Sequence, residues 1–212
     1  APADKKIDAT LVYGVNNDAY KKGEMKAVSA ASCTTNCLAP VTKVLNDKWG
    51  VEMGTMTTVH GYTMDQKVLD TAHSKPTRGR TSAANIIPTT TGAAAAIGLV
   101  IPELNGKMDG MAIRVPVPDG SLVDLTVKLK SDATVEEINA AMKEAAEGEL
   151  KEALGYTEED LVSSDIIGIT YGSLFDANHT RVIEGNWVKL LSWYDNEASF
   201  INQSIRLLTN LL

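Results

Sequence analysis

A cysteine at the start of a predicted helix is the strongest candidate for chemistry in this sequence. Cys33 follows Ser32, a suitable helix N-cap, and opens a segment of helical spacing over 33–48. Free N–H groups and the helix dipole stabilise an anion there, so we expect the pKa of the Cys33 thiol to be lowered. Cys37 lies one turn further along the same face and is expected to be buried. On local sequence alone, two buried structural cysteines are an equally good interpretation.

A histidine that could activate this thiol lies at the end of the next predicted strand. Residues 51–60 return along the helix, which can bring His60 beside Cys33. A Cys–His pair in contact supplies a nucleophile and a general base. The other histidines, His73 and His179, show no metal-ligand spacing, so we predict no metal site and expect structural or surface roles for both.

Several further residues could bind an anion near this pair. They are polar or basic side chains in loops or before a predicted helix: Thr63, Asp65, Arg78, Arg80, Thr91 and Gly92. Arg114 differs because it lies inside an apolar strand, where an unpaired charge is costly. Either it binds an anion or it forms a buried ion pair with an aspartate or glutamate.

The elements that must position these residues point to an α+β fold. Strands are expected at 9–15, 26–28, 51–60, 107–117, 120–130, 165–176, 180–184 and 187–193, and helices at 33–48, 93–100, 134–145 and 196–211. The turn at 118–120 predicts that the strands beside it form a hairpin. Strands outnumber helices, which favours a largely antiparallel or mixed sheet with helices on one face. The polar loop 61–85 has no periodicity, and a loop of this length is often functional.

The composition is that of a globular chain and excludes several function classes. Of the 212 residues, 44% are hydrophobic and 22% charged, so the chain is neither disordered nor fibrous. Its net charge of −7 gives no overall field that attracts nucleic acid or anionic lipid, so we expect neither a nucleic-acid nor a membrane partner. Two cysteines form no disulfide framework, which indicates a reducing, cytoplasmic location. Neither G-x-G-x-x-G nor G-x-x-x-x-G-K-S/T is present, so the sequence shows no phosphate-binding fingerprint for a nucleotide.

One family combines these motifs. The segment 32–37 reads S-C-T-T-N-C and is followed by L-A-P. Further matching segments lie at 57–60, 85–88, 91–94, 101–106, 114–116, 155–157, 162–165 and 193–197. Together they resemble the glyceraldehyde-3-phosphate dehydrogenase family, in its bacterial, glycolytic form, along essentially the whole chain.

The resemblance implies a phosphorylating, NAD-dependent oxidation of an aldehyde through a thioester. Cys33 would attack the aldehyde carbon of glyceraldehyde 3-phosphate, and His60 would be the base. Asn196 would hydrogen-bond the nicotinamide carboxamide of NAD. The residues implied for the C3 phosphate of the substrate are Thr63, Asp65 and Arg114. Those implied for inorganic phosphate are Ser32, Thr34, Thr91 and Gly92, with Arg78 or Arg80 from the loop.

The resemblance also implies a division of the chain. Residues 1–32 would be a remnant of the NAD-binding domain, 33–195 the catalytic domain, and 196–212 a helix that packs on the NAD-binding domain. The main NAD site would belong to the N-terminal part of the family, which these 212 residues do not contain, so we expect the isolated chain to be inactive. The family forms homotetramers, in which the loop 62–85 lines the cofactor site of a neighbouring subunit.

Two alternative functions remain at this stage. Erythrose-4-phosphate dehydrogenase resembles the same motifs, and turnover of the two aldehydes would separate the enzymes. The chain could also be a binding fragment without enzymatic activity.

Overall fold

A seven-stranded mixed sheet is the centre of the fold. The computed structural model describes residues 7–211, so residues 1–6 and 212, at the outer ends of the two predicted flanking segments, lie outside the described residues. In spatial order the strands are β4 (Ile87–Thr90), β5 (Met108–Val115), β3 (Val51–Gly61), β6 (Ser121–Leu129), β9 (Trp187–Tyr194), β8 (Ser173–Ile183) and β7 (Leu154–Thr157). Neighbours pair antiparallel except β3 with β5 and β7 with β8. The predicted α+β class is confirmed.

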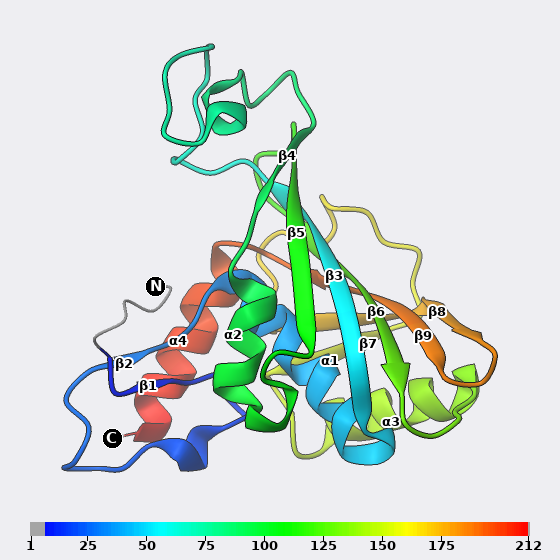
Figure 1. Cartoon of the computed structure of the whole chain (residues 1–212). Coiled ribbons are helices and arrows are strands. Elements are labelled where there is room, and N and C mark those ends of the chain that lie inside the picture. The colour runs from blue at the N-terminus through cyan, green and yellow to red at the C-terminus, as the bar shows by residue number, and fades with distance from the viewer. Residues whose placement is uncertain (1–6, 212) are drawn as a thin grey trace.

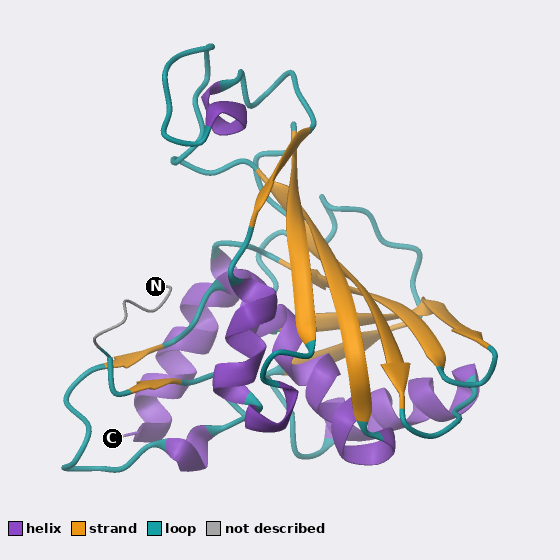
Figure 2. Cartoon of the chain, viewed as in Figure 1, coloured by secondary structure: helices purple, strands orange, loops and turns teal. Residues whose placement is uncertain are grey.

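Three helices cover one face of this sheet, as predicted (Figure 2). α1 (Cys33–Trp49) contacts β6, β8 and β9, α3 (Val135–Glu147) contacts β7 and β8, and α2 (Ala93–Val100) contacts β5. Strand β6 shows why the core lies between the two layers. Val123, Leu125 and Val127 are buried, while the side chains between them are only partly covered.

The predicted hairpin at 118–120 is wrong, because β3 lies between β5 and β6. β5 runs parallel to β3, and β6 runs antiparallel to it. The connecting residues cross the end of β3, where the Tyr62 N–H donates to the Val117 carbonyl at 3.0 Å. Alternating polarity identified the two strands, but it carries no information on which strand pairs with which.

Other strands also differ from the prediction. β4 and β7 were not predicted, since four residues are too few to show an alternating pattern. The strands expected at 165–176 and 180–184 form one strand, β8, with a shift of register between Asp176 and Arg181. Residues before Ser173 form turns, where Gly168 has a φ of +86°.

A small second unit lies beside the helices. β1 (Ala9–Thr10) and β2 (Val28–Ser29) form a parallel pair, and η1 (Asn17–Ala19) lies between them in sequence. The strand predicted at 9–15 is shorter because Asn16 accepts from the Val12 N–H at 2.8 Å and turns the chain. α4 (Ala198–Leu211) packs near η1 and α1, so the first and last elements of the described chain lie on the same side of the molecule (Figure 1).

The long polar loop projects from the end of the sheet (Figure 1). It is irregular, as predicted, and contains the short helix η2 (Pro76–Gly79). The Asp70 carboxylate organises it by accepting from the Thr81 N–H at 2.7 Å and from Arg80 Nε at 2.9 Å. A further short helix, η3 (Pro102–Leu104), leads into β5. Within residues 7–211, no helix is long and apolar enough to cross a membrane.

Candidate active site

A cavity of about 860 Å³ opens where the N-termini of α1 and α2 meet the ends of β3 and β5. Most of the predicted site residues line it. They are Ser32, Cys33, Thr34, His60, Thr63, Arg78, Thr91, Gly92, Arg114 and Asn196. The fold therefore gathers residues that are distant in sequence into one concave site.

The first turn of α1 presents the thiol to the cavity. Ser32 caps the helix, with its Oγ accepting from the Thr35 N–H at 3.1 Å. The preceding Ala31 has a φ of +61°, a strained conformation for a residue with a Cβ. Cys33 is partly exposed, whereas Cys37 faces the core and is fully buried. As expected, Cys37 is more deeply buried than Cys33.

The end of β3 places His60 against this thiol. Cys33 Sγ and His60 Nε2 are 3.5 Å apart, and the imidazole is buried. The predicted route, along one helix and back along one strand, brings the two side chains together. Their distance suits proton transfer between a thiol and a general base.

Arg114 reaches the same histidine from the neighbouring strand. The parallel register of β3 and β5 pairs His60 with Arg114. Arg114 Nη1 lies 2.7 Å from His60 Nδ1 and donates to the Gly61 carbonyl at 2.7 Å. No carboxylate of residues 7–211 forms an ion pair with Arg114, and its buried Nε has no partner there. A cation held in this way is available for an anionic ligand.

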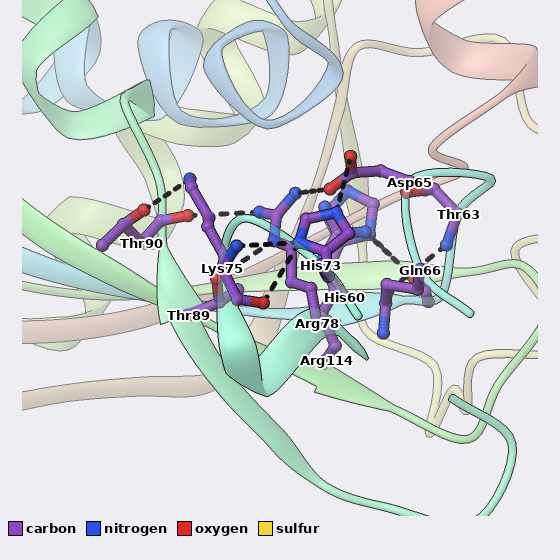
Figure 3. Close-up of polar contacts among 11 residues, drawn as sticks. His60, Thr63, Asp65, Gln66, His73, Lys75, Arg78, Thr89, Thr90 and Arg114 are labelled. Atoms are coloured by element: carbon purple, nitrogen blue, oxygen red, sulfur yellow. Dashed lines mark hydrogen bonds and ion pairs between the residues drawn. The ribbon is translucent and has the colours of Figure 1, made fainter. Parts of the chain in front are cut away.

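The other predicted anion-binding residues separate into two groups (Figure 3). Arg78 lines the cavity, with its Nε donating to Thr89 Oγ1 at 3.0 Å. Asp65 does not line the cavity, because its carboxylate pairs with Arg78 and faces His73 Nε2 at 3.4 Å. Arg80 points away and pairs with Asp70 at 2.9 Å. Of the two loop arginines, Arg78 is the one that the structure brings to the site.

The loop between β9 and α4 supplies Asn196. Its Oδ1 accepts from Ser121 Oγ at 2.7 Å, which fixes the orientation of the amide. Its buried Nδ2 has no partner among the described residues. An amide donor that lines a cavity and is held without a partner suits a carbonyl acceptor of a ligand.

Comparison with known proteins agrees with this geometry. The family model described as glyceraldehyde 3-phosphate dehydrogenase, C-terminal domain, matches residues 32–196. The chain is 56% identical over 207 residues to glyceraldehyde-3-phosphate dehydrogenase 1 of Bacillus subtilis and 55% identical to the enzyme of Geobacillus stearothermophilus. In both cases the match covers 98% of this chain and 62% of the relative.

The chain belongs to the glyceraldehyde-3-phosphate dehydrogenase family. It contains the family's C-terminal domain and spans less than two thirds of the length of these curated relatives. The resemblance read from the sequence is thereby confirmed.

Desolvation sets the protonation state of the Cys–His pair in this family member. Burial raises the pKa of the Cys33 thiol, and this outweighs the hydrogen bonds from Thr34 and the charge of Arg114, which lower it. Burial, followed by the charge of Arg114, lowers the pKa of His60 to about 4. Both groups are therefore uncharged at neutral pH. The expected lowering of the thiol pKa is wrong, because the helix N-terminus contributes less than burial removes.

The position of one proton decides whether His60 can act as a base. Nδ1 lies 2.7 Å from both the Gly61 carbonyl and Arg114 Nη1. Arg114 Nη1 can only donate, so it hydrogen-bonds Nδ1 when the ring hydrogen is on Nε2. With the hydrogen on Nδ1 and donated to Gly61, Arg114 Nη1 donates to the Gly61 carbonyl alone, and the lone pair of Nε2 faces Cys33. This tautomer is the one that accepts the thiol proton.

Among the lining or supporting residues that were not predicted, three carry polar groups that bear on the chemistry of the site: Tyr194, Lys75 and Glu197. Tyr194 is buried, with its hydroxyl 2.8 Å from Thr34 Oγ1 and 2.7 Å from Thr58 Oγ1, and its ring meets His60 edge-on at 5.7 Å between centroids. Lys75 and Glu197 line the cavity. Tyr194 lies within the segment 193–197 that carried the resemblance, whereas nothing in the sequence separates Lys75 from other loop lysines.

The second cysteine, Cys37, packs in the core and does not line the cavity. Burial raises the pKa of Cys37 to about 12, and its Sγ lies 3.7 Å from Ser173 Oγ. Across the described part of the chain, histidine, cysteine and acidic side chains form no group of three or more that could hold a metal ion.

Proposed function

We propose that this chain is the catalytic part of a phosphorylating, NAD-dependent glyceraldehyde-3-phosphate dehydrogenase. The observation that carries the proposal is the 3.5 Å approach of Cys33 Sγ to His60 Nε2 in a cavity with uncompensated cationic donors. A thiol beside a base fits addition to an aldehyde. The donors fit the two phosphate groups, one on the substrate and one that enters as inorganic phosphate.

The chain's own residues account for the proton and bond changes. His60 Nε2 accepts the Cys33 thiol proton as sulfur bonds to the aldehyde carbon of glyceraldehyde 3-phosphate, and that proton passes to the new alkoxide. His60 then accepts the hydroxyl proton of this hemithioacetal as the carbon loses a hydride and becomes a thioester. NAD, when bound, supplies the hydride acceptor. A phosphate oxygen attacks the thioester carbon, the carbon–sulfur bond breaks to release an acyl phosphate, and the departing Cys33 sulfur takes back the proton from His60.

An anion at Arg114 would prepare the pair for this chemistry. In the structure the guanidinium lowers the pKa of His60 through its charge and contacts Nδ1. A phosphate bound to Arg114 offsets that charge, so it raises the pKa of His60 and favours transfer of the thiol proton. Substrate binding and base strength are coupled through this one side chain.

Asn196 fits the nicotinamide end of NAD. Its unpartnered Nδ2 lines the cavity and suits the carboxamide oxygen. We place the main NAD site outside these 212 residues, because the sequence has no glycine-rich dinucleotide fingerprint. In this division, residues 1–32 and 196–212 belong with the NAD-binding domain, and 33–195 form the catalytic domain.

The proposal extends to partners and location. Glyceraldehyde 3-phosphate and inorganic phosphate are the substrates, a cytoplasmic homo-oligomer is the working form, and the projecting loop 62–85 lies at a subunit contact. Exposed apolar residues in that loop support the contact, since Met64 is 99% and Leu69 75% exposed. No nucleic acid or membrane is a partner in this proposal.

Steady-state kinetics of the complete polypeptide that carries this sequence test the proposal. We expect NAD reduction with glyceraldehyde 3-phosphate to require inorganic phosphate, and to fall by about 10³-fold or more in Cys33→Ala. Preferential turnover of erythrose 4-phosphate would favour the alternative dehydrogenase. Absence of turnover with either aldehyde in the wild type would contradict an enzymatic function.

A further inference from the structure

A row of polar side chains in and just before α4 binds the backbone of one turn, residues 166–170. The four side chains recur at helical spacing and so lie along one face: Asp195, Ser199, Gln203 and Arg206. Asp195 Oδ2 accepts from the Gly168 N–H at 2.7 Å, and Ser199 Oγ donates to the Ile169 carbonyl at 3.3 Å. Gln203 Nε2 and Arg206 Nη1 both donate to the Thr170 carbonyl, at 2.8 and 2.6 Å. Successive side chains of this row therefore bind successive residues of the turn.

Gln203 and Arg206 also fix α4 to a second segment of the catalytic core. Gln203 Nε2 donates to the Glu152 carbonyl at 2.8 Å, and Arg206 Nη1 donates to the same carbonyl at 3.0 Å. Glu152 has a φ of +71°, a strained conformation for a residue with a Cβ. The Gln203 side chain is 2% exposed, so removing its donor leaves two backbone carbonyls facing an acceptor or an apolar group instead of an N–H.

The two faces of α4 differ in character. The proposed division places α4 with the NAD-binding domain, and its apolar residues Ile201, Ile205 and Leu208 are each more than half exposed. The polar row is nevertheless hydrogen-bonded to the turn 166–170 of the catalytic domain. Hydrogen bonds depend on direction and distance, so they define the position of the helix more narrowly than apolar contact does.

The same row holds the backbone of Asn196. The Asp195 N–H donates to Ser199 Oγ at 3.1 Å, and Asp195 Oδ1 accepts from the N–H groups of Glu197 and Ala198 at 2.8 and 2.7 Å. Ser121 orients the Asn196 amide, but the backbone from which that amide extends is held by α4. A displacement of α4 therefore moves the amide that lines the cavity.

We propose that Gln203 and Arg206 are positioning residues for hydride transfer. They lie outside the cavity, and they act by fixing α4, and with it Asn196, to the turn 166–170 and to Glu152. Small displacements of a group that orients a reactant have a large effect on rate, which gives these distant contacts their functional weight. The inference rests on the proposed function for the nicotinamide contact, but not for the fixing of α4 itself.

Hydrogen exchange tests the fixing of α4 without using turnover. Gln203→Glu keeps the shape of the side chain and replaces the Nε2 donor by an acceptor that faces two carbonyls. In the complete polypeptide, we expect peptides that contain Gly168 or the pair 197–198 to exchange about tenfold faster in this variant than in the wild type. Ser204→Ala is the matched control, because Ser204 Oγ donates to the Phe200 carbonyl within α4, at 2.8 Å. Equal exchange in Gln203→Glu and the wild type would overturn the proposal.

Steady-state kinetics separate positioning from a general loss of stability. In Gln203→Glu we expect the KM for NAD to rise and kcat to fall, each by about threefold to tenfold, with the KM for glyceraldehyde 3-phosphate unchanged. Alkylation of Cys33 by iodoacetamide should keep its wild-type rate, because the Cys33–His60 pair does not contact α4. Equal rises in both KM values, or wild-type values of kcat and of the KM for NAD, would overturn the proposal.

A second position keeps the test independent of one variant. Arg206 is less buried than Gln203, so Arg206→Met serves if Gln203→Glu does not fold. We expect the same direction of change in exchange and in kinetics, and Arg206→Lys, which retains a cationic donor, should restore most of the loss. Equal behaviour of Arg206→Met and the wild type would overturn the proposal. An inactive wild type would contradict the proposed function and leave the exchange result to decide whether α4 is fixed in this way.

Discussion

At the scale of single residues, burial sets the protonation state of the Cys33–His60 pair. Burial raises the pKa of Cys33 and lowers that of His60, so neither group carries charge at neutral pH. The sequence predicted the partners but not their protonation, since the cost of burial depends on side chains from β3, β5 and β9. The order of one helix and one returning strand predicted that Cys33 and His60 would meet, and they lie 3.5 Å apart. The contact of Arg114 with His60 depends on the register of β3 and β5, which the sequence does not show.

The neutral state of His60 predicts a loss of stability in acid. Its pKa is about 4 in the fold, against an ordinary value of 6.5 when unfolded. Between these values the unfolded chain binds more protons, so the free energy of unfolding falls as pH decreases from 6.5 to 4. The contribution is about 3 kcal/mol. Urea unfolding at neutral pH and near the lower value should show a smaller loss in His60→Asn than in the wild type. An unchanged pH dependence in the variant would contradict the buried neutral imidazole.

Arg114 predicts a selective loss of affinity for the phosphorylated aldehyde. Removing the guanidinium in Arg114→Leu deletes a charge-assisted contact that typically contributes about 2–4 kcal/mol. The KM for glyceraldehyde 3-phosphate should rise strongly, while the KM for unphosphorylated glyceraldehyde changes little; the lost contact with His60 affects kcat for both aldehydes. Equal rises in KM for both aldehydes would show that Arg114 acts through the structure of the site and not through the substrate phosphate.

At the scale of elements, the helix ends were predicted correctly, whereas several strands and the pairing of the strands beside the turn at 118–120 were not. Ser32 and Gly50 marked the ends of α1, and Thr134 with Glu137 forms the capping box that was expected before α3. The turn at 118–120 connects β5 to β6 across the end of β3, so the two strands do not pair. Turn residues and alternating polarity define structure over a few residues. The placement of β3 between β5 and β6 depends on contacts between residues that are distant in the sequence.

The close approach of β3 and β5 predicts a strict requirement at Gly110. A Cβ added there would lie 2.5 Å from the Met56 carbonyl oxygen, a backbone atom in the neighbouring strand. Gly110→Ala should therefore lower the free energy of unfolding by about 1–3 kcal/mol. Gly92→Ala is the matched control, because an added Cβ there meets nothing within 4 Å. Equal stability of the two variants in urea unfolding would contradict this packing.

At the scale of the whole molecule, an acidic chain concentrates cations in one cavity. The net charge is −7, yet among the described residues the cavity is lined by Lys75, Arg78 and Arg114 and by one carboxylate, Glu197. Composition gave no reason to expect a nucleic-acid partner, and it could not locate a local positive site. That site arises only when the loop, β5 and both helix N-termini come together.

The exposed face of α4 predicts how the isolated chain behaves. Ile201, Ile205 and Leu208 lie on one side of this helix and are 54%, 58% and 59% exposed. An apolar face of this kind favours association. In the proposed division, Asn196 supplies the nicotinamide contact and the main NAD site lies in the part of the family that precedes this domain. Positioning of the hydride acceptor can contribute about 7–11 kcal/mol to the reaction. We expect the 212-residue chain to self-associate in sedimentation analysis and to show no NAD-dependent turnover. Tight NAD binding in calorimetry, with full turnover, would contradict the proposal that the main NAD site lies outside these 212 residues.

Trapping the covalent intermediate tests the central claim that Cys33 is the nucleophile. The complete polypeptide is mixed with glyceraldehyde 3-phosphate and NAD in the absence of inorganic phosphate, quenched in acid and analysed by peptide mass spectrometry. The account predicts an acyl group on Cys33 and not on Cys37, lost when phosphate is added before the quench, and absent from Cys33→Ala. An acyl group on another residue, or turnover by Cys33→Ala at the wild-type rate, would contradict it.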